Sequence, residues 1–211
     1  MPRPLFVSLD GLDGTGKSTQ CRLLAEWLRK QGQEVVECTD PGGTKIGEAI
    51  REILLDQPHE SNLGTSMTLA CEALLFMASR AQLTAEVIRP ALEAGRTVVA
   101  DRYLLANVVY QGHAGGFDPK LLWEIGRLAT GGLMPDLTIV LDLPAEVAIS
   151  RRAEPADRVE SRDLAYHQRV REGFLAEARR HPDTIQVVDT APPIQKVHEQ
   201  IRHVLATHSR P

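Results

Sequence analysis

The stretch LFVSLDGLDGTGKST, residues 5–19, constrains the fold more than any other part of the chain. It contains a short apolar run, a loop of the pattern G-x-x-x-x-G-K-[ST] from Gly11 to Ser18, and then apolar residues at helical spacing. A strand, a glycine-rich loop and a helix in this order are the setting in which such a loop binds a polyphosphate. Glycines let backbone N–H groups turn inward, and the helix N-terminus adds partial positive charge. We interpret the stretch as a phosphate-binding loop.

Two side chains of this loop have chemistry that suits a nucleotide phosphate. Lys17 can reach the β- and γ-phosphates, and the hydroxyl of Ser18 can bind Mg²⁺. The residues predicted to hold the nucleotide are Gly11, Leu12, Asp13, Gly14, Thr15, Gly16, Lys17, Ser18 and Thr19. By itself the loop indicates only that nucleotide phosphates bind, and a simple turn between a strand and a helix is the alternative.

Composition argues against several other classes of protein. A length of 211 residues predicts a single domain, residues 1–211, with a substantial core. A formal net charge of −4 provides no basic field for nucleic acid, so we expect no nucleic-acid partner. Three scattered cysteines predict reduced thiols and a cytoplasmic location. We expect no signal peptide and no membrane partner, because the apolar runs are too short.

Apolar runs of strand length alternate with helical segments along the rest of the chain. Strands are predicted at 5–9, 34–38, 97–100, 137–143 and 184–188. Besides the helix after the loop, helical segments are predicted at 46–55, 67–92, 106–110, 121–129, 145–152, 163–180 and 194–206, with a flexible loop at 112–116. The alternation predicts an α/β fold, in which a five-stranded parallel sheet lies inside a three-layer α/β/α sandwich of the P-loop NTPase type.

Acidic residues follow several of these strands, namely Asp10, Asp40, Asp101 and Asp189. In parallel sheets the ligand lies beyond the carboxyl ends of the strands, so these groups should gather near the binding edge. A carboxylate at Asp101 can hold Mg²⁺ through water, which makes Ser18 and Asp101 the predicted metal-binding residues. The neighbouring guanidinium of Arg102 can bind a phosphate with two parallel hydrogen bonds.

Further motifs extend almost from end to end of the chain. They are DPGGT (40–44), EALLFMASRAQL (72–83), PALEAGRTVVADRY (90–103), NVVYQG (107–112), PDLTIVLDL (135–143) and DRVE (157–160). Together with the glycine loop, this set resembles bacterial thymidylate kinases, which are P-loop nucleoside monophosphate kinases. The resemblance implies Mg²⁺-dependent transfer of the γ-phosphoryl group of ATP to dTMP, giving dTDP for dTTP biosynthesis. It also implies a homodimer.

The resemblance assigns an acceptor site for dTMP. Phe76 and Arg80 are four residues apart and share a helix face, and the family uses the matching pair to stack on thymine and to contact the base. Arg51 and Arg102 match arginines near the acceptor phosphate, and Asp13 matches an acid near both sets of phosphates. The other implied acceptor contacts are Asn107 and Gln111 near the base and Tyr110 against the 2′ position of the sugar.

The polar segment at about 151–162 resembles the lid of the family. Its Arg151, Arg152 and Arg158 supply positive charge, with Arg151 expected to bind ATP and Arg158 expected to act in catalysis. The P-loop has Gly14 where many relatives have a basic residue, as in the subgroup that supplies this charge from the lid. The implied catalytic set is Lys17, Asp13, Arg102 and Arg158.

The chain departs from the usual family pattern at four positions. Ala106 stands where serine is frequent, Thr39 replaces an arginine, and Asp40 and Asp10 replace glutamates. These changes leave the phosphate chemistry in place and concern the acceptor site.

Other interpretations stay open from the sequence. The acceptor could be dUMP, UMP, CMP or a nucleoside, or the chain could be a regulatory P-loop module that binds nucleotide without transfer. The site residues also have purely structural interpretations: Phe76 and Tyr110 as core, Arg51 and Arg80 as solvated surface, and Asp13 as a loop cap.

Overall fold

Five parallel strands form the centre of the computed structural model, which describes residues 3–55, 67–152, 158–159 and 161–208. The strands are β1 (Phe6–Gly11), β2 (Val35–Thr39), β3 (Thr97–Asp101), β4 (Leu137–Asp142) and β5 (Ile185–Asp189), in the spatial order β2-β3-β1-β4-β5. The strand β1 is buried along its whole length, because it pairs with β3 on one side and β4 on the other. This confirms the predicted parallel sheet.

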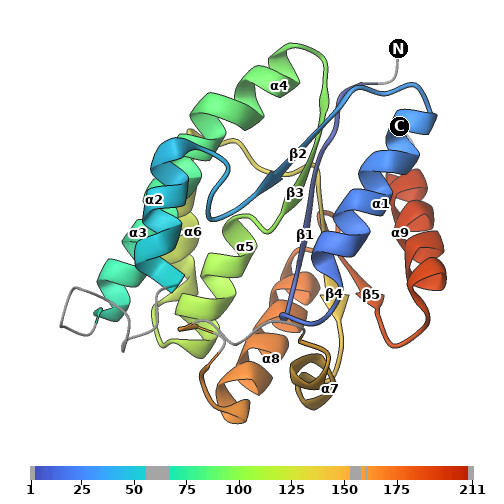
Figure 1. Ribbon diagram of the computed structural model, residues 1–211. Helices are drawn as coiled ribbons and strands as arrows, with labels where there is room; N and C mark the ends of the chain where they lie inside the picture. Colours follow the sequence, from blue (N-terminus) through green and yellow to red (C-terminus); the bar gives the residue numbers. More distant parts are fainter. Residues whose placement is uncertain (1–2, 56–66, 153–157, 160, 209–211) are drawn as a thin grey trace.

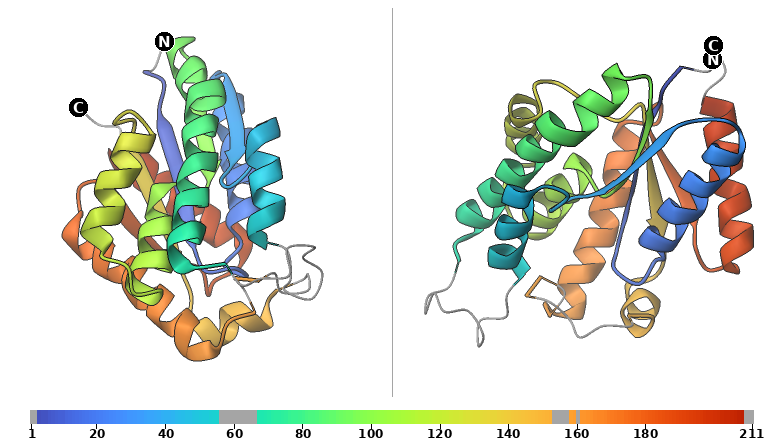
Figure 2. Two further views of the ribbon diagram at one scale, coloured as in Figure 1. Left: turned by 90° about the vertical axis from the view of Figure 1, so that its left-hand side faces the viewer. Right: turned by 45° about the horizontal axis from the view of Figure 1, so that its top comes forward.

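Helices cover both faces of this sheet (Figure 1). They are α1 (Lys17–Lys30), α2 (Lys45–Leu55), α3 (Leu69–Leu83), α4 (Arg89–Glu93), α5 (Leu104–Asn107), α6 (Pro119–Ala129), α7 (Ala145–Ser150), α8 (Leu164–Arg180) and α9 (Ile194–His208), with two π-helical segments, η1 (Thr84–Ile88) and η2 (Val108–Ala114). Helices α1 and α9 lie together on one face, and α3, α5, α6 and α8 lie on the other (Figure 2). The three-layer sandwich is thereby confirmed.

Neighbouring residues of the central strands enter opposite halves of the core. Val99 packs with Leu24 of α1 and Ile201 of α9, whereas Val98 packs with Met77 of α3 and Leu122 of α6. Such strands read as continuous apolar runs because both of their faces are buried, and this made them recognisable in the sequence. None of the helices among the described residues is long and apolar enough to cross a bilayer.

One expectation about the helices was wrong. The predicted flexible loop at 112–116 is helical as far as Ala114, because η2 continues α5 without a break. Gly112 is buried there, and a Cβ atom on it would lie 3.1 Å from Leu122 Cδ1, so this glycine serves close packing rather than flexibility. The predicted helix 67–92 is confirmed, because the chain is helical without a break from Leu69 to Glu93, through α3, η1 and α4. The possible break before Pro90 does not occur: Pro90 lies in the first turn of α4, where proline is tolerated.

The packing of α8 against η2 provides a test of this arrangement. Gly173 of α8 is buried, and a Cβ atom there would lie 2.7 Å from His113 Cβ and 3.0 Å from Val109 Cγ1. In an open helix Gly→Ala would add about 1 kcal/mol of stability, but here we expect Gly173→Ala to lower the free energy of unfolding by about 1–3 kcal/mol. Urea unfolding measures this. The exposed neighbour Glu172 serves as the control, with Glu172→Ala expected within about 0.5 kcal/mol of the wild type. A Gly173→Ala variant as stable as the wild type would contradict the close packing.

Candidate active site

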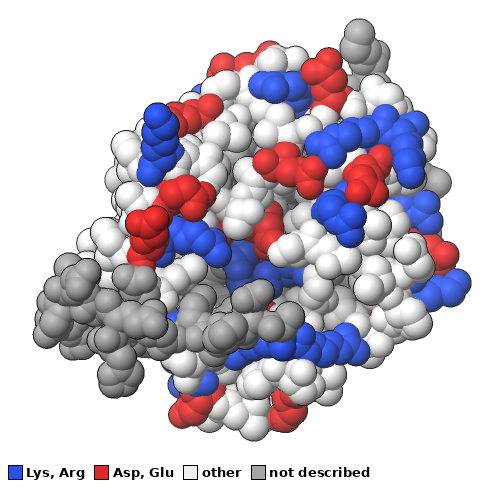
Figure 3. Space-filling model, in the orientation of Figure 1, with Lys and Arg blue, Asp and Glu red and all other residues white. Residues whose placement is uncertain are grey.

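A cavity of about 510 Å³ opens at the carboxyl ends of the strands. Its walls come from the P-loop, the turn after β2, helices α2 and α3, the end of β3, the α5–η2 segment and the residues after α7. The predicted site residues that line it are Asp13, Gly14, Gly16, Lys17, Ser18, Thr19, Arg51, Phe76, Arg80, Asp101, Arg102, Asn107, Tyr110, Gln111 and Arg151. Lys and Arg side chains gather in the hollow on this face of the molecule (Figure 3).

The P-loop packs closely against α7, the helix that precedes Arg151 and Arg152. Gly14 has a φ of 87°, and a Cβ atom on it would lie 2.0 Å from the backbone oxygen of Ala148. No side chain fits there without moving the backbone of α7. The absence of a basic residue at this position of the loop therefore follows from the packing, and cations must reach the phosphates from elsewhere.

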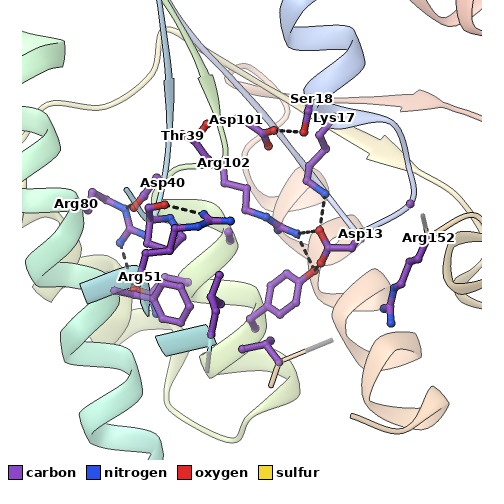
Figure 4. A pocket seen from close by; sticks show the side chains of 18 of the residues that line it. Asp13, Lys17, Ser18, Thr39, Asp40, Arg51, Arg80, Asp101, Arg102 and Arg152 are labelled. Carbon is purple, nitrogen blue, oxygen red and sulfur yellow. Dashed lines mark hydrogen bonds and ion pairs between the residues drawn. The ribbon is translucent and has the colours of Figure 1, made fainter. Parts of the chain in front are cut away.

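Asp13 joins the two sides of the cavity (Figure 4). Its Oδ1 lies 3.0 Å from Lys17 Nζ and 2.6 Å from Arg102 Nη2, and its Oδ2 accepts a hydrogen bond from the Tyr110 hydroxyl at 3.3 Å. Burial opposes the ionisation of Asp13, but Arg102 and Lys17 outweigh it and hold the pKa of this carboxyl well below its usual range. The cluster therefore keeps a fixed negative charge between two cations.

Arg102 reaches this cluster from an unusual backbone conformation. Its φ is 70°, and among the described residues it is the only non-glycine residue with a positive φ. Residues held in this region cost free energy and are concentrated at functional sites. The conformation coincides with the point where β3 ends and the chain turns into α5.

Ser18 and Asp101 meet at the edge of the cavity, where the Ser18 hydroxyl donates to Asp101 Oδ2 at 2.6 Å. Behind them, Asp10 is fully buried and its Oδ1 has no hydrogen-bond partner among the described residues. Burial raises the pKa of Asp10 to about 7, against the opposing effect of Arg102 and Lys17. The described residues hold no cluster of three or more His, Cys, Asp or Glu side chains suited to a metal. A hydroxyl and one carboxylate suit Mg²⁺, which keeps several waters and shares substrate phosphates.

Arg80 organises the far wall of the cavity. It is 1% exposed, its Nε donates to Asp40 Oδ2 at 2.6 Å, and its Nη1 donates to Asn107 Oδ1 at 3.1 Å. Asn107 in turn donates to Gln111 Oε1 at 2.7 Å. Phe76, one turn before Arg80, is half-buried and lines the same cavity. The sequence analysis missed Asp40 as the partner of Arg80, although its position at a strand end pointed to this edge.

Arg51 comes from α2 and lines the cavity beside the turn after β2. Its Nη1 donates to the backbone oxygen of Pro41 at 2.8 Å, so the helix is tied to that turn. Gly11, Leu12 and Thr15 belong to the loop but lie outside the lining of this cavity.

The arginines of the predicted lid differ in whether they line the cavity. Arg151 and Arg152 line the cavity, and Arg151 Nη1 also donates to Thr190 O at 3.0 Å. Arg158 does not line it: its Nη1 lies 2.7 Å from Glu72 Oε2, and its Nε donates to Leu54 O at 2.8 Å. The structure thus separates Arg158 from the P-loop cations with which the sequence grouped it. Residues 153–157 and Glu160, also part of that segment, lie outside the described residues.

A second cavity, of about 550 Å³, adjoins the other side of the P-loop. It is lined by Gly14, Thr15, Gly16, Thr19, Gln20, Arg151, Thr190, Ala191, Pro192, Pro193, Ile194 and Val197. The loop between β5 and α9 therefore faces the glycine loop across this space.

Comparison with known proteins identifies the family. The family model "Thymidylate kinase" matches residues 9–201. A thymidylate kinase of Symbiobacterium thermophilum is 47% identical over 202 residues, which covers 95% of this chain and 92% of the relative. One from Rhodopirellula baltica is 46% identical over 196 residues, covering 93% of this chain and 78% of the relative.

A solved structure agrees with this family. The crystal structure of thymidylate kinase from Ehrlichia chaffeensis superposes with a TM-score of 0.79 at 27% identity, covering 97% of this chain and all of that one. The sequence match, the shared fold and a P-loop that faces a buried arginine across one cavity lead to the same conclusion: the chain belongs to the thymidylate kinase family and is a phosphotransferase with dTMP as its acceptor.

Proposed function

We propose that the protein phosphorylates dTMP with ATP by holding the two nucleotides at opposite ends of the cavity and neutralising the charge between them. The observation that carries this assignment is the Lys17–Asp13–Arg102 cluster, which connects the P-loop with the end of β3 in the same cavity that Phe76 and Arg80 line. Donor phosphates bind at the loop, and the acceptor phosphate meets Arg102 and Arg51.

The donor site extends into the second cavity. The P-loop residues hold the phosphates of ATP, and the space between the loop and Thr190–Ile194 takes the nucleoside. Arg151 borders both cavities and is tied to Thr190, so it is placed to contact ATP. Arg152 is the other cation of this segment that lines the main cavity. Arg158 can take its predicted catalytic role only after leaving Glu72.

The acceptor site lies against α3 and η2. Phe76 stacks on thymine, and Arg80, Asn107 and Gln111 contact the edge of the base. Tyr110 is held by Asp13 and Arg102, which fixes its ring beside the sugar, where a 2′-hydroxyl would collide with it. These groups select a deoxypyrimidine monophosphate.

Little proton chemistry is needed, because the oxygen of the acceptor phosphate is already a nucleophile near neutral pH. Catalysis then consists of positioning and stabilisation of charge. Lys17 and Arg102 supply positive charge, and Asp13 fixes both of them in place. Mg²⁺ would be held by Ser18 and, through water, by Asp101, and it would neutralise the phosphates of ATP.

Three alternative functions are less well supported by the site. A kinase for UMP or CMP would not need the crowding by Tyr110, and a nucleoside kinase would not need Arg102 and Arg51 together at the acceptor end. A regulatory module that only binds nucleotide would not need a second, buried recognition wall around Arg80.

Removal of the P-loop lysine tests the donor role. We expect Lys17→Ala to lower kcat by at least about 10²–10³-fold, because one preorganised charge next to the transferring group is lost. A coupled assay of ADP release with ATP, Mg²⁺ and dTMP measures this, and the same assay without divalent metal should show no transfer. The control is Lys30→Ala at the other end of the same helix, where the side chain is exposed. Near-normal turnover of folded Lys17→Ala would refute the phosphate role.

The sugar selectivity tests the acceptor site. The wild type should prefer dTMP and dUMP to UMP, and Tyr110→Ala should reduce this preference because it removes the ring that crowds the 2′ position. Tyr110→Phe keeps the ring and loses only the hydroxyl, so it should keep the preference while lowering turnover. The preference of each variant is measured as its kcat/KM values for dTMP, dUMP and UMP. Equal rates of the wild type on UMP and dTMP would argue against the assignment of Tyr110.

We further propose that the protein is a cytoplasmic homodimer. Its three cysteines are all free, as expected for a reducing compartment. Apolar side chains are exposed on three helices that lie side by side in Figures 1 and 2, α2, α3 and α6: Ile46 at 54%, Ile53 at 42%, Leu74 at 56%, Leu121 at 42% and Leu128 at 83%. A second copy would cover this face.

Sedimentation velocity at micromolar concentration tests the dimer. The wild type should sediment as a dimer, and Leu74→Arg should shift it to the monomer by placing a charge in the apolar face. The matched control is Val187→Arg on the edge strand β5, where an apolar side chain 42% exposed lies away from α2, α3 and α6. A monomeric wild type would overturn the proposal.

A further inference from the structure

Glu72 is a buried carboxylate just outside the active-site cavity. It lies in the first turn of α3, is 1% exposed, and does not line the cavity. Gln111 Nε2 donates to its Oε1 at 2.7 Å, and Arg158 Nη1 lies 2.7 Å from its Oε2. Arg162 Nη2 contacts both oxygens, at 3.1 and 2.8 Å. Each carboxylate oxygen therefore has two donors, which come from η2 and from the segment before α8.

One of these donors begins a row of hydrogen bonds that runs into the site. Gln111 donates to Glu72 and accepts from Asn107, and Asn107 accepts from Arg80, whose Nε ends the row on Asp40. A carboxylate can only accept and a guanidinium can only donate, so the two ends of the row allow a single orientation of both amides. Glu72 supplies the acceptor that fixes one of these ends.

The members of this row other than Glu72, namely Gln111, Asn107, Arg80 and Asp40, all line the cavity. Amide groups have nearly the same shape in both orientations, so only their partners decide which face of the amide meets a ligand. If the row were reversed, the amino group of Asn107 would face Arg80, and two donors would oppose each other. The guanidinium would then lose its support beside the base.

We propose that Glu72 is a positioning residue, which sets the direction of the Gln111–Asn107–Arg80 hydrogen bonds for recognition of the base. It also joins this row to Arg158 and Arg162 before α8. The inference rests on the acceptor site proposed above. Its consequence is selectivity: Arg80 offers only donors, which match the O4 carbonyl of thymine and oppose the amino group of cytosine.

The variant Glu72→Gln tests this role, because Arg158 and Arg162 claim the oxygen of the new amide, and its amino group then faces the amino group of Gln111, so that two donors oppose each other at this end of the row. We expect the ratio of kcat/KM for dTMP to that for dCMP to fall about tenfold, the effect of one misdirected hydrogen bond. The matched control is Glu177→Gln on α8. Glu177 is also 1% exposed and holds His113, Trp123 and Arg180, but the hydrogen bonds of the Glu72–Gln111–Asn107–Arg80 row do not include it. The variant Glu177→Gln should lower the melting temperature and leave the dTMP/dCMP ratio of kcat/KM unchanged.

A double-mutant cycle separates positioning from general support. If Glu72 acts through Gln111, the variant Glu72→Gln/Gln111→Ala should lose no more of the dTMP/dCMP ratio than Gln111→Ala alone. Additive losses, or an unchanged ratio in Glu72→Gln, would overturn the proposal. The wild-type ratio itself separates the two hypotheses, because a wild type without preference for dTMP would refute the acceptor site rather than the role of Glu72.

A second variant covers the case in which Glu72→Gln does not fold. Arg162→Gln removes a partner that contacts both carboxylate oxygens but leaves Arg158 in place, and its side chain is 25% exposed. We expect KM for dTMP to rise several-fold, although Arg162 does not line the cavity. An unchanged KM in this folded variant would overturn the link between the row and the arginines before α8.

Discussion

The carboxylate of Asp13, held between Lys17 and Arg102, is the interaction on which the rest of the site depends. It connects the glycine loop after β1 with the end of β3, and these are neighbouring strands of the sheet. Without it, two cations would face each other across a partly buried space. With it, both cations are fixed before any substrate arrives, at the place where the proposed function puts the negative charge that develops during phosphoryl transfer. The strained backbone of Arg102 is understandable in this setting, because the conformation brings the guanidinium to Asp13.

Pairs of acidic and cationic side chains recur across the cavity. Asp40 pairs with Arg80, and Asp13 pairs with Lys17 and Arg102, so the acids at the strand ends hold the cations in place. The lining nevertheless contains more cationic than acidic side chains. This surplus suits a site that receives two phosphorylated nucleotides, since the negative charge missing from the protein is carried by the substrates. A net charge of −4 for the whole chain hides this local excess.

Local patterns predicted most of the fold, whereas contacts between distant segments were out of reach. The strands were found because they are short apolar runs, and the P-loop because its function requires adjacent residues. The helical course of η2 was missed, because the buried setting of Gly112 depends on Leu122 of another helix. Arg158 was grouped with the catalytic cations because its segment resembles the lid of the family, but its partner Glu72 belongs to α3, far away along the chain. No spacing rule connects such residues.

The departures from the usual family pattern can be understood from the same contacts. Asp40 is shorter than the usual glutamate, yet its carboxylate accepts from Arg80 Nε at 2.6 Å, so this arginine of the proposed acceptor site is still held. Ala106 lines the cavity without a hydroxyl, and in the proposed acceptor site the polar edge of the base then depends on the neighbouring amides of Asn107 and Gln111. With one polar group fewer, the direction of those amides matters more, because no hydroxyl is present at that position to adapt to either orientation. A chain with alanine here therefore has particular need of a fixed acceptor at the outer end of the row.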